Sequence, residues 1–200
     1  MPRLTRNRVT QTLVVATWLV GVTYSFWWFF LQNISAFDSR GIYTQQLSRV
    51  NPVRYPELLN QLKTKYSDEQ LVIHWLDVTC SCFKFSVSEI QRQIDNAPSG
   101  VQHLLVYKGN LRPKNEVLAD VPVVDLTEQE LAVSQSFIPA SPAVSILTKD
   151  SPFYSYLGPH SSGLLCGTGK SFVDVTLNNL STGFDPQLMN VMQTGCYCNW

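Results

Sequence analysis

The sequence predicts an α/β domain preceded by one N-terminal transmembrane helix. Three observations carry the prediction: a long uncharged apolar stretch near the N-terminus, a strand, helix and strand in succession, and two short apolar runs around a polar turn. With 44% hydrophobic and 15% charged residues, the 200-residue chain can bury the core of one domain. Its net charge is zero, so we expect neither a phosphate-binding surface nor a nucleic-acid partner.

The apolar stretch is residues 13–31, which contain no charged side chain. A helix of this length, at about 1.5 Å per residue, has about the span of a bilayer core. Arg3, Arg6 and Arg8 precede it, so the positive-inside rule places residues 1–12 in the cytoplasm and the domain outside. The bulky residues that end the stretch are a poor match to a signal-peptide cleavage site. We therefore expect an uncleaved, single-pass anchor.

The outer part should begin with a tether and short helices. Residues 32–66 hold this tether and the helices. Within them, residues 43–65 have helical character that Asn51-Pro52 and Tyr55-Pro56 interrupt, which predicts two short helices. The aliphatic and aromatic run at residues 71–78 then predicts a buried strand.

A helix and a second strand follow. Apolar side chains recur at spacings of three and four from Phe83 to Ala97, which predicts an amphipathic helix that ends at Pro98-Ser99-Gly100. Residues 101–107 predict the second strand. This order builds a right-handed parallel crossover.

The second half predicts shorter elements. Thr127 with Glu130 is a capping-box pair that should open a helix. The expected elements are a short strand at 121–126, that helix at 127–136, an antiparallel hairpin of 143–147 with 153–157, a helix at 170–180 and a last short helix at 186–192. Gly163 and Gly169-Lys170-Ser171 resemble a phosphate loop, but their spacing is one residue too long, so no nucleotide site is expected.

The cysteines are the chemically informative residues. Cys80 and Cys82 stand where the first strand gives way to a helix, and the positive end of a helix favours a thiolate, the form that attacks disulfides and binds metals. Cys196 and Cys198 repeat the Cys-x-Cys spacing near the end of the chain, while Cys166 stands alone. Disulfides persist outside the cytoplasm, and an odd count leaves one thiol unpaired unless a metal binds it.

The segment His-Trp-Leu-Asp-Val-Thr-Cys-Ser-Cys at residues 74–82 resembles the strand-to-active-site segment of thioredoxin-like proteins, and the order of elements over residues 67–180 is similar to theirs. The whole chain resembles their membrane-anchored bacterial members. The resemblance implies a central mixed sheet flanked by helices. It also implies that Ser141-Pro142 is a cis-proline site, where Pro142 helps hold an extended polypeptide substrate, and that Asp77 is a buried carboxylate for proton transfer. A turn residue at the strand end is the other interpretation of Asp77.

The spacing departs from the family pattern, which is Cys-x-x-Cys. Counting from Trp75 puts Cys82 at the family's second cysteine position, whereas helix phase turns Cys80 inward and leaves Cys82 more exposed. Which cysteine attacks stays open. A disulfide between Cys80 and Cys82 would depart from relaxed geometry and be easily reduced, which favours an oxidant or isomerase over a reductant.

Residues 181–200, the last helix and the Cys-x-Cys tail, allow three hypotheses. Cys196 and Cys198, with Cys166 at the same end of the fold, resolve or relay a disulfide at Cys80 and Cys82. Alternatively, the two pairs supply four thiolates to Zn²⁺ or Cu(I). In the third hypothesis, disulfides only staple the tail to the domain.

The expected function is thiol–disulfide exchange, without a cofactor, on protein thiols and disulfides in the periplasm of a bacterium, with the chain anchored in the inner membrane. The alternatives are a copper- or zinc-handling module and a non-catalytic binding domain. His74, His103 and His160 are expected to be structural or solvated.

Overall fold

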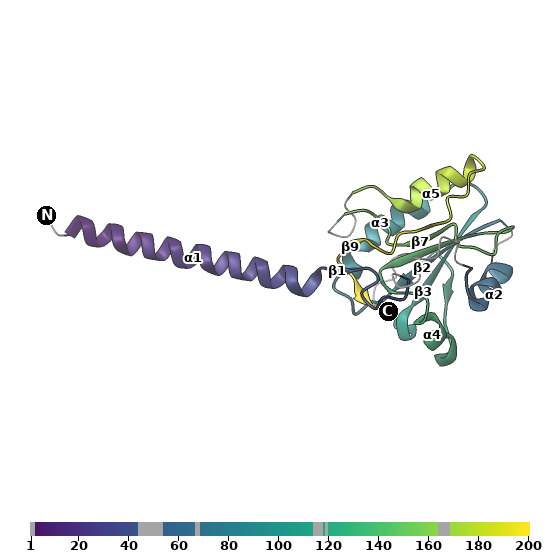
Figure 1. Cartoon of the computed structure of the whole chain (residues 1–200), viewed down its shortest axis with the longest axis horizontal. Coiled ribbons are helices and arrows are strands. Elements are labelled where there is room, and N and C mark those ends of the chain that lie inside the picture. Colours follow the sequence, from purple (N-terminus) through teal and green to yellow (C-terminus); the bar gives the residue numbers. More distant parts are fainter. Residues whose placement is uncertain (1–2, 44–53, 67–68, 114–117, 119, 164–168) are drawn as a thin grey trace. The chain divides into compact units, whose positions relative to one another are not determined.

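The computed structural model describes residues 3–43, 54–66, 69–113, 118, 120–163 and 169–200. The chain divides into two compact units, Met1–Ile34 and Ser35–Trp200 (Figure 1). The first unit is helix α1, Arg3–Asn33. Within it, Arg8–Phe29 is long and apolar enough to cross a membrane, and the apolar window is 0% buried. The helix is therefore compatible with the expected single-pass anchor rather than with a core helix of a soluble protein.

The second unit is built on a six-stranded mixed sheet with the order β4-β3-β2-β6-β7-β8. Strand β2 pairs in parallel with β3 and antiparallel with β6. Six of its seven residues are buried, as expected for a strand covered on both faces. The strands are β2 (Gln70–Leu76), β3 (Val101–Tyr107), β4 (Val123–Val124), β6 (Ala143–Thr148), β7 (Tyr156–Gly158) and β8 (Leu188–Met189).

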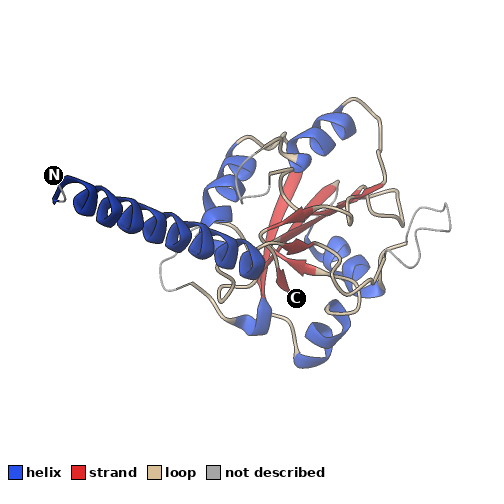
Figure 2. Ribbon diagram, turned by 60° about the vertical axis from the view of Figure 1, so that its left-hand side comes forward, coloured by secondary structure: helices blue, strands red, loops and turns tan. Residues whose placement is uncertain are grey.

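Helices cover both faces of this sheet (Figure 2). Alternate residues of β2, such as Ile73 and Trp75, share one core cluster with side chains of α2 and α4. Residues of the opposite parity, such as Val72, pack with α5, and Leu76 packs with α3. The helices are α2 (Glu57–Tyr66), α3 (Phe83–Asp95), α4 (Glu128–Ser134) and α5 (Phe172–Ser181), with a short 3₁₀ turn η1 (Lys108–Asn110) after β3.

Most predicted elements are confirmed. Strand β3 has the predicted bounds, the crossover through α3 is parallel, and β6 with β7 forms the antiparallel hairpin. At the start of α4 the Thr127 hydroxyl accepts a hydrogen bond from the Glu130 N–H at 3.2 Å, and the Glu130 carboxylate accepts one from the Thr127 N–H at 2.7 Å. Of the two helices predicted in residues 43–65, α2 is present and the first lies outside the described residues.

The helix predicted at 186–192 is wrong. This segment is extended and contains β8, which extends the sheet from β7. The Leu188 N–H donates to the Ser155 carbonyl at 3.0 Å, and the Asn190 N–H donates to the Leu157 carbonyl at 2.8 Å. An isolated helix of so few residues is marginal, whereas the strand satisfies backbone groups along the edge of β7.

The chain then makes two more antiparallel strand pairs. Strand β9 (Thr194–Gly195) pairs with β1 (Ser35–Ala36), and β10 (Cys198–Asn199) pairs with β5 (Ala140–Ser141). The C-terminal segment therefore returns to the domain in extended form, over the strand that precedes Pro142.

Candidate functional site

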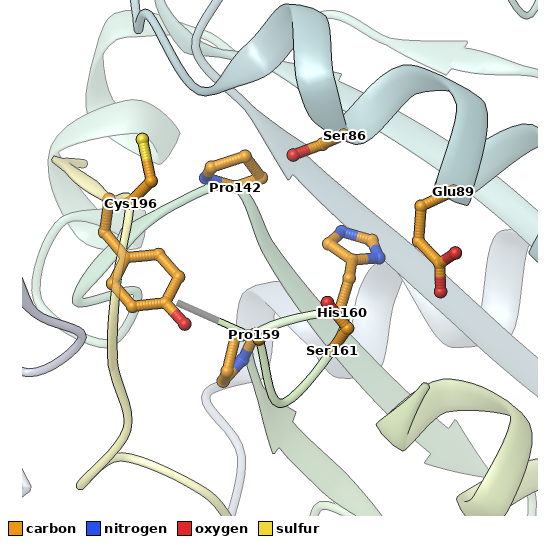
Figure 3. Close-up of a pocket in the computed structure, with 9 residues that line it drawn as sticks. Ser86, Glu89, Pro142, Pro159, His160, Ser161 and Cys196 are labelled. Carbon is orange, nitrogen blue, oxygen red and sulfur yellow. The ribbon is translucent and has the colours of Figure 1, made fainter. Parts of the chain in front are cut away.

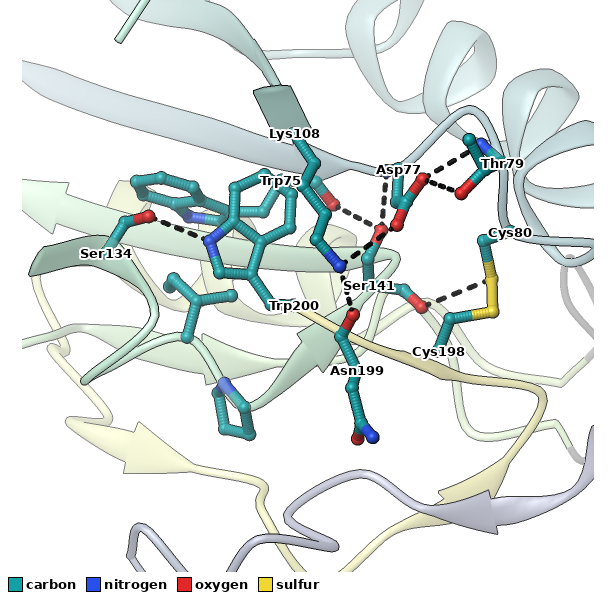
Figure 4. Close-up of polar contacts among 12 residues, drawn as sticks. Trp75, Asp77, Thr79, Cys80, Lys108, Ser134, Ser141, Cys198, Asn199 and Trp200 are labelled. Carbon is teal, nitrogen blue, oxygen red and sulfur yellow. Dashed lines mark hydrogen bonds and ion pairs between the residues drawn. A yellow bond between two sulfur atoms is a disulfide. The ribbon is translucent and has the colours of Figure 1, made fainter. Parts of the chain in front are cut away.

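Two disulfides join the Cys-x-Cys pairs crosswise. Cys80 is bonded to Cys198, and Cys82 is bonded to Cys196. The hypothesis of a Cys80–Cys82 disulfide is therefore wrong for this state of the protein. Strand pairing explains why Cys80 is bonded to Cys198. In the register of β10 with β5, Cys198 lies opposite Ser141. The Ser141 carbonyl oxygen in turn lies 3.7 Å from the Cys80 sulfur (Figure 4).

Cys80 and Cys82 occupy the turn between β2 and α3. The Cys80 N–H donates to the Asp77 carbonyl at 3.0 Å, and Cys82 is the N-cap residue of α3. Only 4% of Cys80 and 1% of Cys82 is exposed. The prediction from helix phase that Cys82 is more exposed is wrong. Both cysteines are bonded to the tail. Their position around the α3 helix axis carries no information about that contact.

Ser141 and Pro142 lie beside the disulfides. The Ser141-Pro142 peptide bond is cis. The Ser141 hydroxyl accepts a hydrogen bond from the Asp77 N–H at 2.8 Å and contacts the Trp75 carbonyl at 3.2 Å. The backbone of β5 that precedes the proline is paired with β10, so the chain's own tail occupies this strand edge.

Asp77 is a buried, hydrogen-bonded carboxylate at the end of β2. Its Oδ1 accepts hydrogen bonds from the Thr79 N–H at 2.9 Å and the Thr79 hydroxyl at 2.6 Å, and its Oδ2 lies 3.3 Å from the Lys108 ammonium. Burial alone would raise the pKa of Asp77, but the hydrogen bonds from Thr79 and Lys108 outweigh it and lower that pKa. Asp77 is therefore ionised at neutral pH. Its hydrogen bond from the Thr79 N–H also makes it a turn residue at the end of β2, which was the other interpretation of this position.

Lys108 was missed by the sequence analysis. Its ammonium also donates to the Asn199 carbonyl at 2.7 Å, so one side chain connects Asp77 to the tail. The predicted order of strands could have identified Lys108. Lys108 directly follows the second strand, and the carboxyl ends of adjacent parallel strands meet at one edge of a sheet.

The last residue of the tail belongs to the core. Trp200 is 3% exposed, and its indole lies edge-on to that of Trp75 with 5.6 Å between ring centroids. Its Nε1–H donates to the Ser134 hydroxyl at 2.8 Å. The tail is thus held by packing and hydrogen bonds as well as by disulfides.

The sulfur atoms form a compact group. Among the described residues, the Sγ atoms of Cys80, Cys82 and Cys198 all lie within 4.8 Å of one another. Such a set can shuttle a disulfide between neighbours, or bind a soft metal ion once the bonds are reduced. Cys166 lies outside the described residues, so its predicted relay role stays a prediction.

A small cavity of about 20 Å³ lies against the Cys196 side of the second disulfide (Figure 3). That volume is enough for about one water molecule. The residues that line it come from α3, from the Pro142 strand, from the segment after β7 and from the tail, and include Ser86, Pro142, His160, Ser161, Cys196 and Tyr197.

A family model described as "Domain of unknown function (DUF6436)" matches residues 52–200, which include β2, α3 and the tail. The chain belongs to the DUF6436 family. All four disulfide-bonded cysteines, Asp77 and Pro142 lie inside the DUF6436 region. No curated protein matches the chain.

Two solved structures are similar to this DUF6436 chain. An uncharacterized conserved protein from Geobacillus kaustophilus matches with a TM-score of 0.53 and 18% identity, covering 76% of this chain and 90% of that one. A hypothetical protein from Sinorhizobium meliloti 1021 matches with a TM-score of 0.49 and 12% identity, covering 76% and 91%. The first match shows a shared fold, and at this identity it shows the fold alone.

The DUF6436 domain also gathers its three histidines, which the sequence analysis treated separately. The His74 ring is nearly parallel to those of His103 and His160, with 5.2 Å between its centroid and each of theirs, and His74 Nε2 lies within hydrogen-bonding distance of His103 Nδ1 at 2.9 Å. The alternation of side chains along a strand could have grouped His74 with His103. The β2–β3 register pairs His103 with Val72, which lies two residues before His74 and on the same face of the sheet.

The hydrogen bonds of His160 identify its tautomer. Gln93 Nε2 donates to Glu89 Oε1 at 3.0 Å and to the Ser171 hydroxyl at 3.1 Å, so Gln93 Oε1 accepts from His160 Nδ1–H at 2.9 Å. In the neutral ring Nε2 then carries a lone pair, and it has no partner in hydrogen-bonding geometry among the described residues. Burial lowers the pKa of His160 to about 4, against the opposing effects of the Glu89 carboxylate and the Ala143 backbone.

Proposed function

We propose that this DUF6436 protein is a membrane-anchored thiol–disulfide exchange protein with a thioredoxin-like domain in the bacterial periplasm. The observation that carries the proposal is the crosswise pairing of two Cys-x-Cys motifs at the N-terminus of α3. In the reaction, a thiolate of a partner polypeptide attacks a disulfide sulfur of this chain and forms a mixed disulfide. The second thiol of the partner, once deprotonated, attacks that bond, so the partner is oxidised to a disulfide and this chain is reduced to two thiols.

The location of the sulfur atoms supports exchange. Cys82 caps a 13-residue helix, and the unpaired N–H groups and dipole of a helix N-terminus stabilise a thiolate. Each cysteine of the turn is bonded to a cysteine of the tail. A tail cysteine therefore takes part in the exchange, as in the first hypothesis. The ionised Asp77 is held in place by Lys108 next to the same turn.

A redox titration of the full chain in detergent tests the proposal. The chain is equilibrated in glutathione buffers, its free thiols are alkylated, and its ability to oxidise a reduced dithiol protein is measured. We expect both disulfides to titrate reversibly and the dithiol protein to be oxidised stoichiometrically. A variant in which all four paired cysteines are replaced by serine should lose this activity, whereas Ser136→Ala, an exposed change, should keep it. Disulfides that never exchange would support the stapled, non-catalytic alternative.

Soft-metal binding is a second candidate function, favoured by the three sulfur atoms that lie within 4.8 Å of one another. Thiolates at such spacing suit Cu(I) or Zn²⁺. Anaerobic titration of the reduced chain with Cu(I) or Zn²⁺, followed by metal analysis after gel filtration, should then give a stoichiometric complex. The same four-serine variant should bind no metal. Retention of metal by that variant would contradict a cysteine site.

A further inference from the structure

We propose that the two disulfides have different roles: Cys82–Cys196 exchanges with the partner, by attack on Cys196 with Cys82 as the leaving thiolate, and Cys80–Cys198 holds the tail. This inference rests on the proposed thiol–disulfide exchange and specifies its reacting atoms. The sequence alone gives no reason to distinguish the two disulfides, but the residues around Cys80–Cys198 differ from those around Cys82–Cys196.

The Cys80–Cys198 bond is held on both sides by other contacts. Cys198 lies in β10 and pairs with Ser141, and the next residue accepts the hydrogen bond from Lys108. Trp200 follows and is buried against Trp75. If this disulfide opened, strand pairing and the buried indole would keep its sulfurs together, so the bond would re-form quickly at high effective concentration.

The Cys82–Cys196 bond joins a buried cysteine at a helix N-terminus to a cysteine outside the strands. Cys82 is 1% exposed, and Cys196 and Cys198 are both partly buried. Cys198 is held in the β10–β5 pair, whereas Cys196 lies in the turn between β9 and β10, so we expect an incoming thiolate to attack Cys196 first. Cys82 then departs at the N-terminus of α3, where its negative charge is stabilised, and a stabilised thiolate leaves faster.

The cavity beside Cys196 is a second difference between the two disulfides. Cys196 lines this space together with Pro142 and His160, whereas Cys80, Cys82 and Cys198 do not (Figure 3). The packing therefore leaves a gap beside Cys196, where we expect the incoming thiolate to approach.

The incoming thiol loses its proton to solvent and attacks Cys196 Sγ as a thiolate. The new bond joins the partner sulfur to Cys196, the Cys82–Cys196 bond breaks, and its electron pair stays on Cys82 as a thiolate. The second thiol of the partner, also deprotonated, then attacks the partner's own sulfur and releases Cys196 as a thiolate, which leaves a partner disulfide and two reduced cysteines.

Mapping the first opening of the oxidised full chain in detergent tests this assignment. The chain is treated briefly with limiting reduced glutathione, quenched with acid, alkylated with N-ethylmaleimide and digested for mass spectrometry. We expect the first glutathione adduct on Cys196 with the maleimide on Cys82, and at least about tenfold slower opening of Cys80–Cys198. A first adduct on Cys80, Cys82 or Cys198 would overturn the assignment.

Variants separate the roles further. Cys80→Ser with Cys198→Ser should keep the fast exchange within about threefold, whereas Cys82→Ser with Cys196→Ser should abolish it.

A chain without thiol–disulfide exchange and a chain that exchanges through another cysteine give different results. If neither disulfide of the wild-type chain opens in any glutathione buffer, both the proposed function and this assignment are wrong. If exchange occurs through a different cysteine, the proposed function stands and only the assignment falls. Mapping the wild-type chain decides this even if a variant does not fold.

Discussion

Lys108 connects the end of β2 to the tail, because its ammonium contacts both the Asp77 carboxylate and the Asn199 carbonyl. Asp77 is mostly buried, so its negative charge is stabilised by the Lys108 ammonium and by the hydroxyl and N–H of Thr79. Sequence analysis found Asp77 from the strand pattern and the family resemblance. It did not find Lys108, whose role depends on which strand lies beside β2.

Replacing Lys108 by methionine should destabilise the domain at neutral pH. The change leaves a buried carboxylate without its cation, at a cost of about 1–3 kcal/mol. The lowered pKa of Asp77 contributes stability above its unfolded value near 4, and that contribution is lost as pH falls through the folded pKa. The loss of melting temperature measured by circular dichroism should therefore be larger at pH 7 than at pH 3.

The matched control is Arg112→Met. Arg112 and Asp125 form an ion pair at 2.6 Å in which both side chains are 54% exposed. Exposed pairs contribute about 0–1 kcal/mol, so this variant should melt close to the wild-type temperature. Equal losses in the two variants would show that burial of Asp77 does not matter.

At the scale of elements, the helices and strands that could be predicted from the sequence are those long enough to show a periodic pattern of apolar residues or a capping motif. Strands β2 and β3, helix α3 and the capping box of α4 follow from residues that specify their own conformation. The segment after α5 does not. Its strands are two residues long and exist because they satisfy the edges of β7, β1 and β5. No local pattern encodes these partners, so the crosswise disulfides could not be predicted either.

Trp200→Ala tests whether the tail is held by packing as well as by disulfides. Removal of a buried tryptophan side chain costs about 3–5 kcal/mol, so thermal unfolding should occur at a clearly lower temperature. The Cys80–Cys198 disulfide should also open faster in glutathione, since the indole no longer returns Cys198 to Cys80. Alkylation followed by mass spectrometry measures both disulfides in one sample.

Met192→Ala is the control for this change, because Met192 lies in the same segment and is 72% exposed. It should alter neither the melting temperature nor the rate of opening. If Trp200→Ala also left both quantities unchanged, the tail would be held by its disulfides alone.

At the scale of the whole molecule, the domain is closed by cross-links between distant parts of the chain. The disulfides span 118 and 114 residues, and in the chain-entropy model one loop of this length stabilises the folded state by about 4–5 kcal/mol. The loops are nested, so their contributions do not add fully. The three histidines form a buried group on one face of the sheet, where His160 contacts Gln93 of α3.

Reduction should therefore lower the stability of the domain markedly. Urea unfolding of the full chain, followed by near-ultraviolet circular dichroism, should show a lower midpoint in dithiothreitol than in oxidising buffer. The four-serine variant in oxidising buffer should match the reduced wild type. An unchanged wild-type midpoint after complete reduction, verified by alkylation, would contradict a stabilising role.

Mild acid should also destabilise the domain. Burial lowers the pKa of His103 and His160 to about 4 and that of His74 well below its usual value. Unfolded histidines bind protons below about pH 6.5, so stability is complete above that value and falls as pH decreases toward 4. The slope is about 1.4 kcal/mol per pH unit for each histidine.

Urea unfolding at pH 7, 6 and 5 measures this slope. His103→Gln should reduce it by about one histidine's share, whereas the exposed substitution Ser136→Ala should leave it unchanged. Constant stability from pH 7 to 5 would contradict neutral histidines in the folded core.

The edge-on contact between Trp75 and Trp200 also gives the protein its own optical probe. The other three tryptophans of the five lie in α1, outside the second unit. Two indoles at 5.6 Å and 82° are close enough to couple their electronic transitions, and this coupling requires the tail to be docked. Circular dichroism in the indole bands can therefore follow tail release in real time, without a label and without touching a cysteine.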